Sequence, residues 1–351
     1  MNRIASPARA AAQVEGTANP VLVEATRGGH VESWHRGRVA VVAADGRPVM
    51  ALGDTAAPVF PRSAIKFIQA LPLIESGAAD VHGVSSLELA LACASHGGEP
   101  MHTAAVEAWL ARLGLSETDL ECGPHPPVHS PAAEVLVRSG LAPGRLHNNC
   151  SGKHTGFLTV ARHIGAPTAG YSTPEHPVQH LVAAAIRDLT GADPDTAPVA
   201  IDGCGVPTWA VPIAGLALGM ARFADPVGLA PGRQAAIRRL CAAIAANPMM
   251  VAGTDRLCTA VAAASAGEVL VKTGAEGVYV AAVPRRGLGF ALKIDDGARR
   301  AAEVAILALL RRFKALDRST LAGLADFAEP AITNTQGRRV GHFRAAEALN
   351  A

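Results

Sequence analysis

Aromatic side chains are scarce in this sequence. Phe, Trp and Tyr together make up 4% of the 351 residues, and charged residues make up only 18%. Hydrophobic residues reach 49%, so the core must be built from Ala, Leu, Val and Ile, with enough material for one large or two closely packed domains. No run of about 18 apolar residues lacks a polar interruption, and we therefore expect no membrane span.

An excess of either charge is also missing. The 32 basic and 30 acidic residues leave a net charge of +2, and no basic tract is interleaved with aromatic residues, so nucleic acid is not an expected partner. Residues 1–19 lack the continuous apolar stretch of a signal peptide and are expected to form a disordered tail. The six cysteines (93, 122, 150, 204, 241 and 258) include no Cys-x-x-Cys pair, which favours reduced thiols and a cytoplasmic location.

The hydrophobic pattern switches repeatedly between the period of strands and that of helices, without an internal repeat. Residues 38–42 and 48–52 flank Asp45-Gly46, which predicts a β-hairpin. Three short strands are expected at residues 268–272, 278–283 and 288–294, followed by an amphipathic helix over 297–316. The middle of the chain is mostly helical, and Ser130-Pro131 and Thr173-Pro174 each predict a helix start.

Strands at both ends with helices between them indicate an α+β fold rather than an alternating βαβ fold. We expect one antiparallel sheet formed from both chain ends. A mostly helical section at about residues 85–265 would pack against this sheet, and residues 20–351 would form a single domain.

The clearest chemical motif is Ser-x-x-Lys at Ser63 and Lys66, in an apolar helix predicted to run from Pro61 to about Ser76 and to end at Gly77. Residues three apart share a helix face. A serine hydroxyl is a poor nucleophile until a base removes its proton, and a desolvated lysine can do so once its pKa falls. The helix N-terminus also directs amide donors at a developing oxyanion. In isolation, however, the motif more often marks an N-cap serine beside a surface lysine.

A second motif, Lys272-Thr273-Gly274, follows a predicted strand. Ser-x-x-Lys at a helix start combined with Lys-Thr-Gly on a strand is the signature of serine β-lactamases and penicillin-binding proteins. In that arrangement the strand runs beside the nucleophile helix, so Lys272 is expected near Ser63, and two lysines facing one pocket lower each other's pKa. The alternative is an edge-strand lysine that protects against aggregation.

The Ser-Asp-Asn element of those enzymes is missing, and Ser95 is the best substitute for it. Ser95 follows an apolar helix and precedes His-Gly-Gly. This segment suits the wall of a site, and it suits equally well a polar helix C-terminus with Gly97 as the first residue beyond it.

Two further polar clusters stand out. Residues 147–154 precede a helix expected over 155–163 but lack the first glycine of a phosphate-binding loop. Residues 202–207 follow a short strand at 199–201, and their Gly-x-Gly does not open a dinucleotide-binding helix. Cys150 and Cys204 could share a metal ion or be ordinary small buried residues, and the pattern alone favours the second interpretation.

Taken in this order, the motifs resemble those of the class 3 (rhizobial-type) L-asparaginases, a family related in fold to serine β-lactamases and serine-type glutaminases. The resemblance extends from about residue 20 to the end of the chain and becomes specific only in combination. The matching segments are residues 24–33, 62–66, 93–97, 148–154, 202–207 and 272–278.

The resemblance implies a homodimer that hydrolyses L-asparagine to L-aspartate and ammonia. It implies two serine–lysine pairs that form an acyl-enzyme: Ser63 with Lys66, and Ser95 with Lys272.

The resemblance also implies a supporting zinc ion bound by Cys150, Lys153 and Cys204. A neutral amine can ligate zinc only if the protein keeps the lysine deprotonated, and the bare sequence would not suggest such a ligand. The residues implied for substrate contact are Arg62, Asp202 and His154. Arg62 would bind the α-carboxylate, Asp202 would pair with the α-ammonium, and His154 would line the site.

Two other functions fit parts of the pattern. One is a penicillin-recognising hydrolase, an esterase or a glutaminase of the same fold. Asparagine and glutamine differ by one methylene of pocket depth, worth only ~1–3 kcal/mol. The other is a zinc-binding module without enzymatic activity. The missing Ser-Asp-Asn and the lack of a signal sequence argue against a cell-wall substrate, and no exposed apolar tract or nucleic-acid-reading helix supports the binding module.

Overall fold

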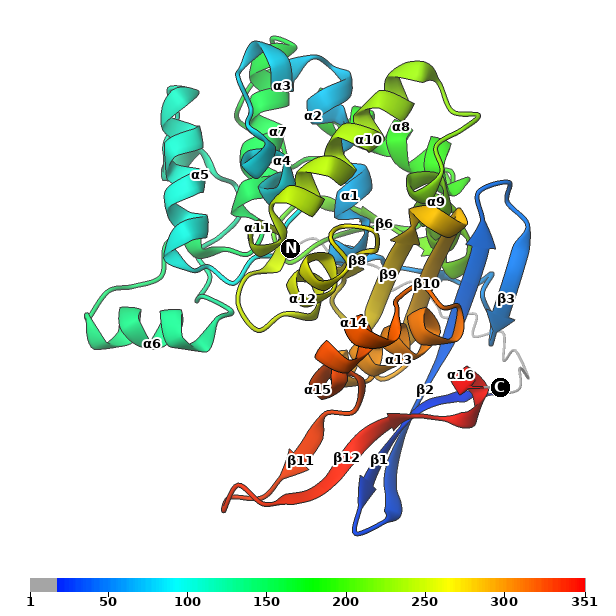
Figure 1. Cartoon of the computed structure of the whole chain (residues 1–351). Coiled ribbons are helices and arrows are strands. Elements are labelled where there is room, and N and C mark those ends of the chain that lie inside the picture. The colour runs from blue at the N-terminus through cyan, green and yellow to red at the C-terminus, as the bar shows by residue number, and fades with distance from the viewer. Residues whose placement is uncertain (1–17, 351) are drawn as a thin grey trace, which may run out of the picture.

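The computed structural model describes residues 18–350, so the tail expected at residues 1–19 lies almost entirely outside the described residues. Its main feature is an antiparallel sheet in the order β11-β12-β1-β2-β10-β9-β8, with β3 paired to β2 (Figure 1). The strands are β1 (Val21–Arg27), β2 (His30–Ala43), β3 (Pro48–Leu52), β8 (Leu270–Thr273), β9 (Val278–Val283), β10 (Leu288–Ile294), β11 (Ala331–Thr333) and β12 (Arg339–Ala345). The sheet expected from both chain ends is therefore confirmed.

Strand β2 belongs to both halves of the sheet. Its first half pairs with β1, and its second half, residues 37–43, pairs with β10. We call β1, β11, β12 and the first half of β2 the arm, which extends away from the helices at the bottom of Figure 1. The hairpin predicted around Asp45-Gly46 joins β2 to β3, and the three strands expected near the C-terminus are β8, β9 and β10.

Most helices lie between β3 and β8 in the chain, as the sequence predicted. They are α1 (Lys66–Gln69), α2 (Leu71–Glu75), α3 (Ala78–Val81), α4 (Ser86–Ala92), α5 (Pro100–Arg112), α6 (Ser130–Arg138), α7 (Ser151–His163), α8 (Pro177–Thr190), α9 (Ile213–Ala224), α10 (Pro231–Ala246), α11 (Pro248–Ala252) and α12 (Leu257–Ala264). After the sheet come α13 (Arg299–Arg312), α14 (Arg318–Gly323), α15 (Ala325–Ala328) and α16 (Glu347–Asn350). Short strands β4 (Pro58–Val59), β5 (Val199–Ile201), β6 (Pro207–Trp209) and β7 (Val211–Pro212) form two small separate pairs.

The sheet separates two hydrophobic cores. Alternate residues of β9 face opposite sides: Val280 and Ala282 join the core of the helical section, whereas Tyr279 and Ala281 join the core beneath α13. Helix α9 packs on β10, β2 and β9 from one side, and α13 packs on β9, β10 and the arm. Because both faces are covered, the strand that carries Lys272 is buried throughout.

Two helix predictions were wrong in detail. The single helix expected from Pro61 to Ser76 is instead a 3₁₀ turn η1 (Arg62–Ile65) followed by α1 and α2, with the break at Ala70. Pro72 has no N–H to donate and stands in the first turn of the second piece. Thr173-Pro174 does not start a helix, because Thr173 bonds back to Gly170; α8 begins at Pro177, capped by the His176 side chain.

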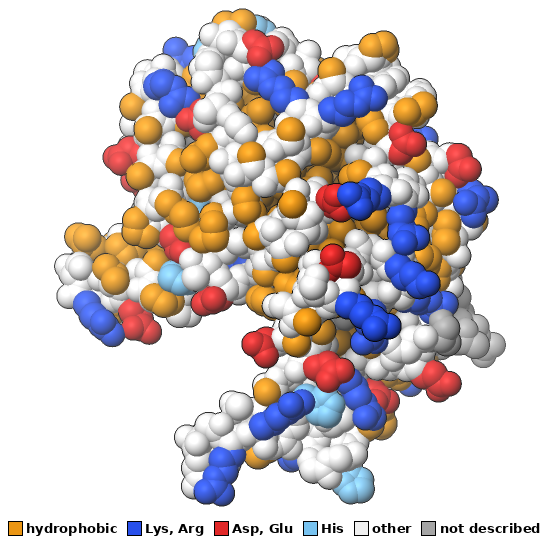
Figure 2. Space-filling model, viewed as in Figure 1, with side chains coloured by type: hydrophobic (Ala, Val, Ile, Leu, Met, Phe, Trp, Pro, Cys, Tyr) orange, Lys and Arg blue, Asp and Glu red, His pale blue; other side chains and the backbone are white. Residues whose placement is uncertain are grey.

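Helix α6 projects from the helical section and buries none of its side chains. The surface over α6 in Figure 2 is rich in apolar atoms. None of the helices between residues 18 and 350 combines the length and the hydropathy of a transmembrane span.

Candidate active site

Three segments distant in sequence meet at the edge of the helical section. They are η1 with Ser63, the loop after α4 with Ser95, and β8 with Lys272. The end of β8 lies against η1, where Gly274 permits a contact that a larger residue would not: a Cβ there would stand 2.6 Å from the Pro61 carbonyl oxygen. The glycine of Lys-Thr-Gly therefore lets the strand approach the serine turn.

Both motif lysines converge on Ser95. Lys272 Nζ lies 2.7 Å from Ser95 Oγ, and Lys66 Nζ lies 3.0 Å from the same atom. Lys66 also donates to the Ala94 carbonyl and contacts Cys150 Sγ, while Lys272 also donates to the Thr273 carbonyl. The Ser95 hydroxyl therefore connects the two lysines.

The sequence left open whether the two lysines belong to a buried site or to the protein surface, and their exposed fractions answer this question. Lys66 and Lys272 are each 1% exposed, and Ser95 is 5% exposed. Neither lysine is a surface residue or a solvated edge-strand charge. Moving an amine out of water needs compensation by hydrogen bonds or loss of its proton, and both routes are open here.

The pKa of Lys272 is lowered to about 7, first by burial and second by the positive charge of Lys66. At neutral pH a large fraction of Lys272 is therefore neutral and can accept the Ser95 hydroxyl proton. The arrangement holds a base within a buried, hydrogen-bonded cluster.

Ser63 is half-buried and stands in η1, the turn that contacts β8. Its hydroxyl has no hydrogen bond to any other described residue, although Lys66 follows one turn later. Arg62, immediately before it, has φ +52°, a left-handed conformation that is strained for arginine. This conformation accompanies a side-chain contact in which Arg62 Nε donates to Asp202 Oδ1 at 2.5 Å.

Asp202 is held as an ion by its surroundings. Although burial opposes this, the charges of Lys153 and Arg62 lower the pKa of the Asp202 carboxyl. The Arg62–Asp202 pair thus lies beside Ser63 with its charges in place. His154 is fully buried and faces elsewhere: its Nδ1 lies 2.6 Å from the Tyr171 hydroxyl, and its contacts do not include Arg62 or Asp202.

A second buried cluster lies beside the first and consists of Cys150, Lys153 and Cys204. Gly152 allows α7 to pack closely on α4, because a Cβ there would lie 2.5 Å from the Leu91 carbonyl oxygen. Lys153 Nζ lies 3.1 Å from Cys204 Sγ, and Cys150 Sγ contacts Lys66 Nζ and Asn149 Oδ1. The neighbouring Cys204 thiol, with burial, raises the pKa of Cys150 to about 12, whereas the Cys150 thiol and the charge of Lys153 lower the pKa of Cys204 well below its usual value.

Family comparison was made against this geometry. A family model for L-asparaginase II matches residues 23–345, which is most of the chain. The chain belongs to the L-asparaginase II family. This confirms the resemblance drawn from the motifs and supports an asparaginase-type hydrolase. A comparison with curated protein sequences finds no significant match.

Solved structures similar to this family member share little sequence with it. The native form of Mglu in 4.3 M NaCl has a TM-score of 0.44 and 15% identity, over 80% of this chain and 62% of that one. The chain thus spans less than two thirds of Mglu. A β-lactamase from Mycobacterium bovis has a TM-score of 0.39 and 15% identity, over 83% and 95% of the two chains. The D-alanine carboxypeptidase AmpC from Burkholderia cenocepacia has a TM-score of 0.38 and 14% identity, over 77% and 93%.

Sequence reasoning missed some groups of the candidate site. The Ala94 carbonyl is a backbone group and leaves no sequence signal, and Asn149, whose Oδ1 contacts the Cys150 thiol, stood unremarked inside a motif. One signal was available. The chain contains only five lysines, at 66, 153, 272, 293 and 314, and the first three are the buried ones of this site. Almost all other cations are arginine, which cannot lose its proton.

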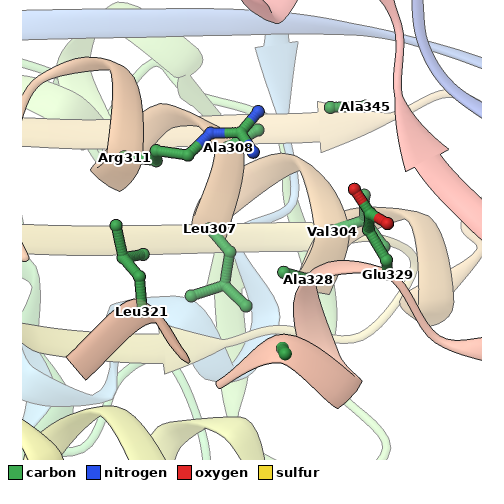
Figure 3. Close-up of a pocket in the computed structure, with 9 residues that line it drawn as sticks. Val304, Leu307, Ala308, Arg311, Leu321, Ala328, Glu329 and Ala345 are labelled. Carbon is green, nitrogen blue, oxygen red and sulfur yellow. The ribbon is translucent and has the colours of Figure 1, made fainter. Parts of the chain in front are cut away.

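Figure 3 shows a cleft of about 230 Å³ that is separate from this site. It lies between α13 and the α14–α15 segment, with Leu307 and Leu321 on its walls and Arg311 and Glu329 at its rim. It contains none of the residues of the serine–lysine cluster. A second cavity, of about 410 Å³, is lined by Arg62, Phe60 and Thr208 and opens beside the Arg62–Asp202 pair.

Proposed function

We propose that this chain is an L-asparaginase that hydrolyses L-asparagine to L-aspartate and ammonia through an acyl-enzyme on Ser63. The observation that carries the proposal is the convergence of two buried lysines on Ser95, next to a half-buried serine. Catalytic bases work when their pKa lies near the working pH, and Lys272 meets this condition.

In the proposed mechanism Ser95 passes a proton between the two lysines. Neutral Lys272 accepts the Ser95 hydroxyl proton, and Ser95 Oγ accepts one from the Lys66 ammonium. Lys66 is then a neutral amine one helical turn from Ser63. The two Nζ–Oγ distances, 2.7 and 3.0 Å, support this transfer. Nucleophile–base hydrogen bonds often shorten only when substrate binds, so the missing Ser63–Lys66 contact is compatible with it.

The proposed reaction then has two stages, acylation of Ser63 and hydrolysis of the resulting ester. Ser63 Oγ bonds to the side-chain amide carbon of asparagine as Lys66 takes the hydroxyl proton. The carbon–nitrogen bond breaks, and this proton leaves with ammonia. Water then attacks the ester, returns a proton to Ser63 and releases aspartate. The surrounding cations, Lys66, Lys272 and Arg62, stabilise the oxyanion that develops.

Ser63 is a better acyl carrier than Ser95 for a geometric reason. Ser95 is 5% exposed and already engaged by two lysines, whereas Ser63 is only half-buried and its hydroxyl bonds to no described residue. For substrate binding, Arg62 uses only Nε for Asp202 and keeps its terminal nitrogens for an α-carboxylate, and Asp202 can pair with an α-ammonium. The only role proposed for His154 is to form part of the buried wall of the site, next to Lys153.

A supporting zinc ion is also part of the proposal. Although burial opposes it, the charges of Cys204 and Cys150 raise the pKa of Lys153, so zinc would have to displace a proton from this amine to bind it. Within residues 18–350 no three His, Cys, Asp or Glu side chains are arranged to hold a metal, so the Lys153 amine would be the third ligand beside Cys150 and Cys204. The two buried thiols, with the lowered pKa of Cys204, provide a soft donor set. When bound, zinc would neutralise thiolate charge and fix the loops at residues 148–150 and 202–205 relative to each other.

Metal analysis of protein purified without chelator should find about one zinc per chain. Cys204→Ala and Cys150→Ala should both lose it, and both should raise KM more than they lower kcat. Cys204→Ala is the cleaner variant, because Cys150 also contacts Lys66. Cys241→Ala, at a half-buried position on α10, is the matched control. Metal-free protein with wild-type KM would show that these thiols are ordinary core residues.

Substrate comparison tests the reaction itself. Ammonia release from L-asparagine should exceed release from L-glutamine and should be accompanied by no cleavage of nitrocefin. Preferential nitrocefin cleavage would replace the proposal with a penicillin-recognising hydrolase, and faster glutamine turnover with a glutaminase. No turnover of any of the three, with zinc bound, would leave a metal-binding module.

The proposal also places the enzyme in the cytoplasm as a homodimer. The location is supported by six cysteines without a disulfide in the described residues, and the dimer by the family resemblance alone.

A further inference from the structure

A polar cavity of about 320 Å³ lies on the far side of the Ser95 loop and shares no residue with the serine–lysine cluster. Its walls are the loop after Ser95, the start of α6, the loop before α12 and the start of α13. The polar groups in these walls belong to Gly97, His129, Ser130, Thr254, Arg256 and Arg299.

The cavity holds an arginine without a partner. Arg299 forms an ion pair with Glu303, with Nε 2.9 Å from Oε1. The Arg256 guanidinium forms no hydrogen bond or ion pair with any residue between 18 and 350, although the Arg256 carbonyl accepts from the Ala260 amide. Asp255 also lines the cavity, but its exposed carboxylate forms no ion pair with either guanidinium. The pKa of Arg256 is lowered, first by burial and then by the charge of Arg299, against the opposing charges of Cys258, Tyr279 and Glu303.

His129 also lines the cavity. His129 Nδ1 is buried and has no hydrogen-bond partner, although it lies 4.0 Å from Glu99 Oε2. The planar fork of a guanidinium matches the two oxygens of a carboxylate or a phosphate. A half-open cavity of about 320 Å³ has room for a small anion.

Hydrogen bonds connect the walls of the cavity to the Ser95 loop. The Ser95 amide donates to the Val251 carbonyl at 2.9 Å, and the His129 amide donates to the Gly97 carbonyl at 3.0 Å. Glu99 accepts from the Thr254 amide and hydroxyl at 2.9 and 2.6 Å. Two walls of the cavity are thus linked to Ser95: Gly97 stands two residues beyond it, and Val251, which holds its amide, stands three residues before Thr254.

We propose that this cavity binds a small carboxylate or phosphate anion, held chiefly by Arg256, at a site separate from the one that binds substrate. The anion would complete the charge balance of the two arginines and join the 97–99 and 254–256 segments. The proposal concerns binding and does not depend on which reaction Ser63 performs.

Isothermal titration of the full chain with inorganic phosphate and, separately, with malonate tests the site at constant ionic strength set by NaCl. We expect saturable binding of at least one probe, and the two titrations distinguish a phosphate site from a carboxylate site. Arg256→Gln should weaken that binding by about tenfold or more, because charge-assisted hydrogen bonds are lost. Arg318→Gln, which changes an exposed arginine on α14, should leave it unchanged.

Arg256→Lys keeps the charge but loses the fork, and it covers the case in which Arg256→Gln does not fold. It should bind the anion more weakly than wild type while retaining the thermal midpoint. Absence of saturable binding to wild type, or equal binding by wild type and the folded Arg256 variants, would overturn the proposal. Because the readout is heat of binding, these outcomes are independent of asparagine turnover.

Discussion

Replacing Ser63 with alanine is expected to lower kcat by at least about a thousandfold, because the hydroxyl proposed to carry the acyl intermediate is lost. The thermal midpoint should stay close to that of wild type, since the Ser63 hydroxyl forms no hydrogen bond with a described residue. Steady-state ammonia release and a thermal melt measure the two effects. Ser139→Ala, an exposed serine at the end of α6, is the matched control.

The same experiment discriminates between the two serines. A Ser63→Ala variant with more than about a tenth of wild-type kcat would mean that Ser95 carries the acyl group. Under the proposed mechanism Ser95→Ala should also be strongly impaired, but through proton transfer. Mass spectrometry of protein quenched during turnover should therefore find an acyl adduct on Ser63 and none on Ser95.

Lys272→Arg is expected to lower kcat/KM by about 10²–10⁴-fold, the range typical of lost general acid–base catalysis. Arginine keeps a positive charge but cannot release its proton at accessible pH, so it cannot accept one from Ser95. Lys272→Met should be similarly inactive. Lys314→Arg, at an exposed position, should behave as wild type. An active Lys272→Arg enzyme would exclude Lys272 from proton transfer.

Wild-type activity should follow the neutral fraction of Lys272. Since its pKa is lowered to about 7, kcat/KM should rise with pH through this value and level off above it, and should fall about tenfold per unit below it. Lys66 and Arg256 lower this pKa, whereas Cys258 and Cys93 raise it slightly. A flat profile between pH 5.5 and about 9 would contradict the assignment.

Local patterns predicted much of the sheet. The Asp45-Gly46 hairpin and the strands at 270–273, 278–283 and 288–294 follow from alternation and turn residues, because these signals are contained within about ten residues. The helix break at Ala70 and the late start of α8 were not predicted. In both places a proline and a competing local hydrogen bond, rather than hydrophobic periodicity, decided the outcome.

The residues of the candidate site were easier to predict than the contacts between them. Motifs identified Ser63, Lys66, Ser95 and Lys272, and the structure brings the last three into direct contact. Spacing along η1 suggested a Ser63–Lys66 pair, but Lys66 instead reaches Ala94 and Ser95 across the cluster. Sequence spacing describes neighbours on one helix, whereas the burial of an amine is satisfied by whatever acceptors the tertiary fold supplies.

Strand β2 pairs with β1 in one half of the sheet and with β10 in the other, and this has a consequence for synthesis on the ribosome. Residues 37–43 emerge early, yet their partner β10 is made roughly 250 residues later, and β1 waits even longer for β12. Until then the most apolar part of β2 has its hairpin partner β3 on one edge and an unpaired edge on the other. Such long-range pairings form slowly and leave strand edges open to association. A chain released before residue 288 would therefore contain Ser63, Ser95 and Lys272 but lack the strand between β2 and β9 that joins them into one site.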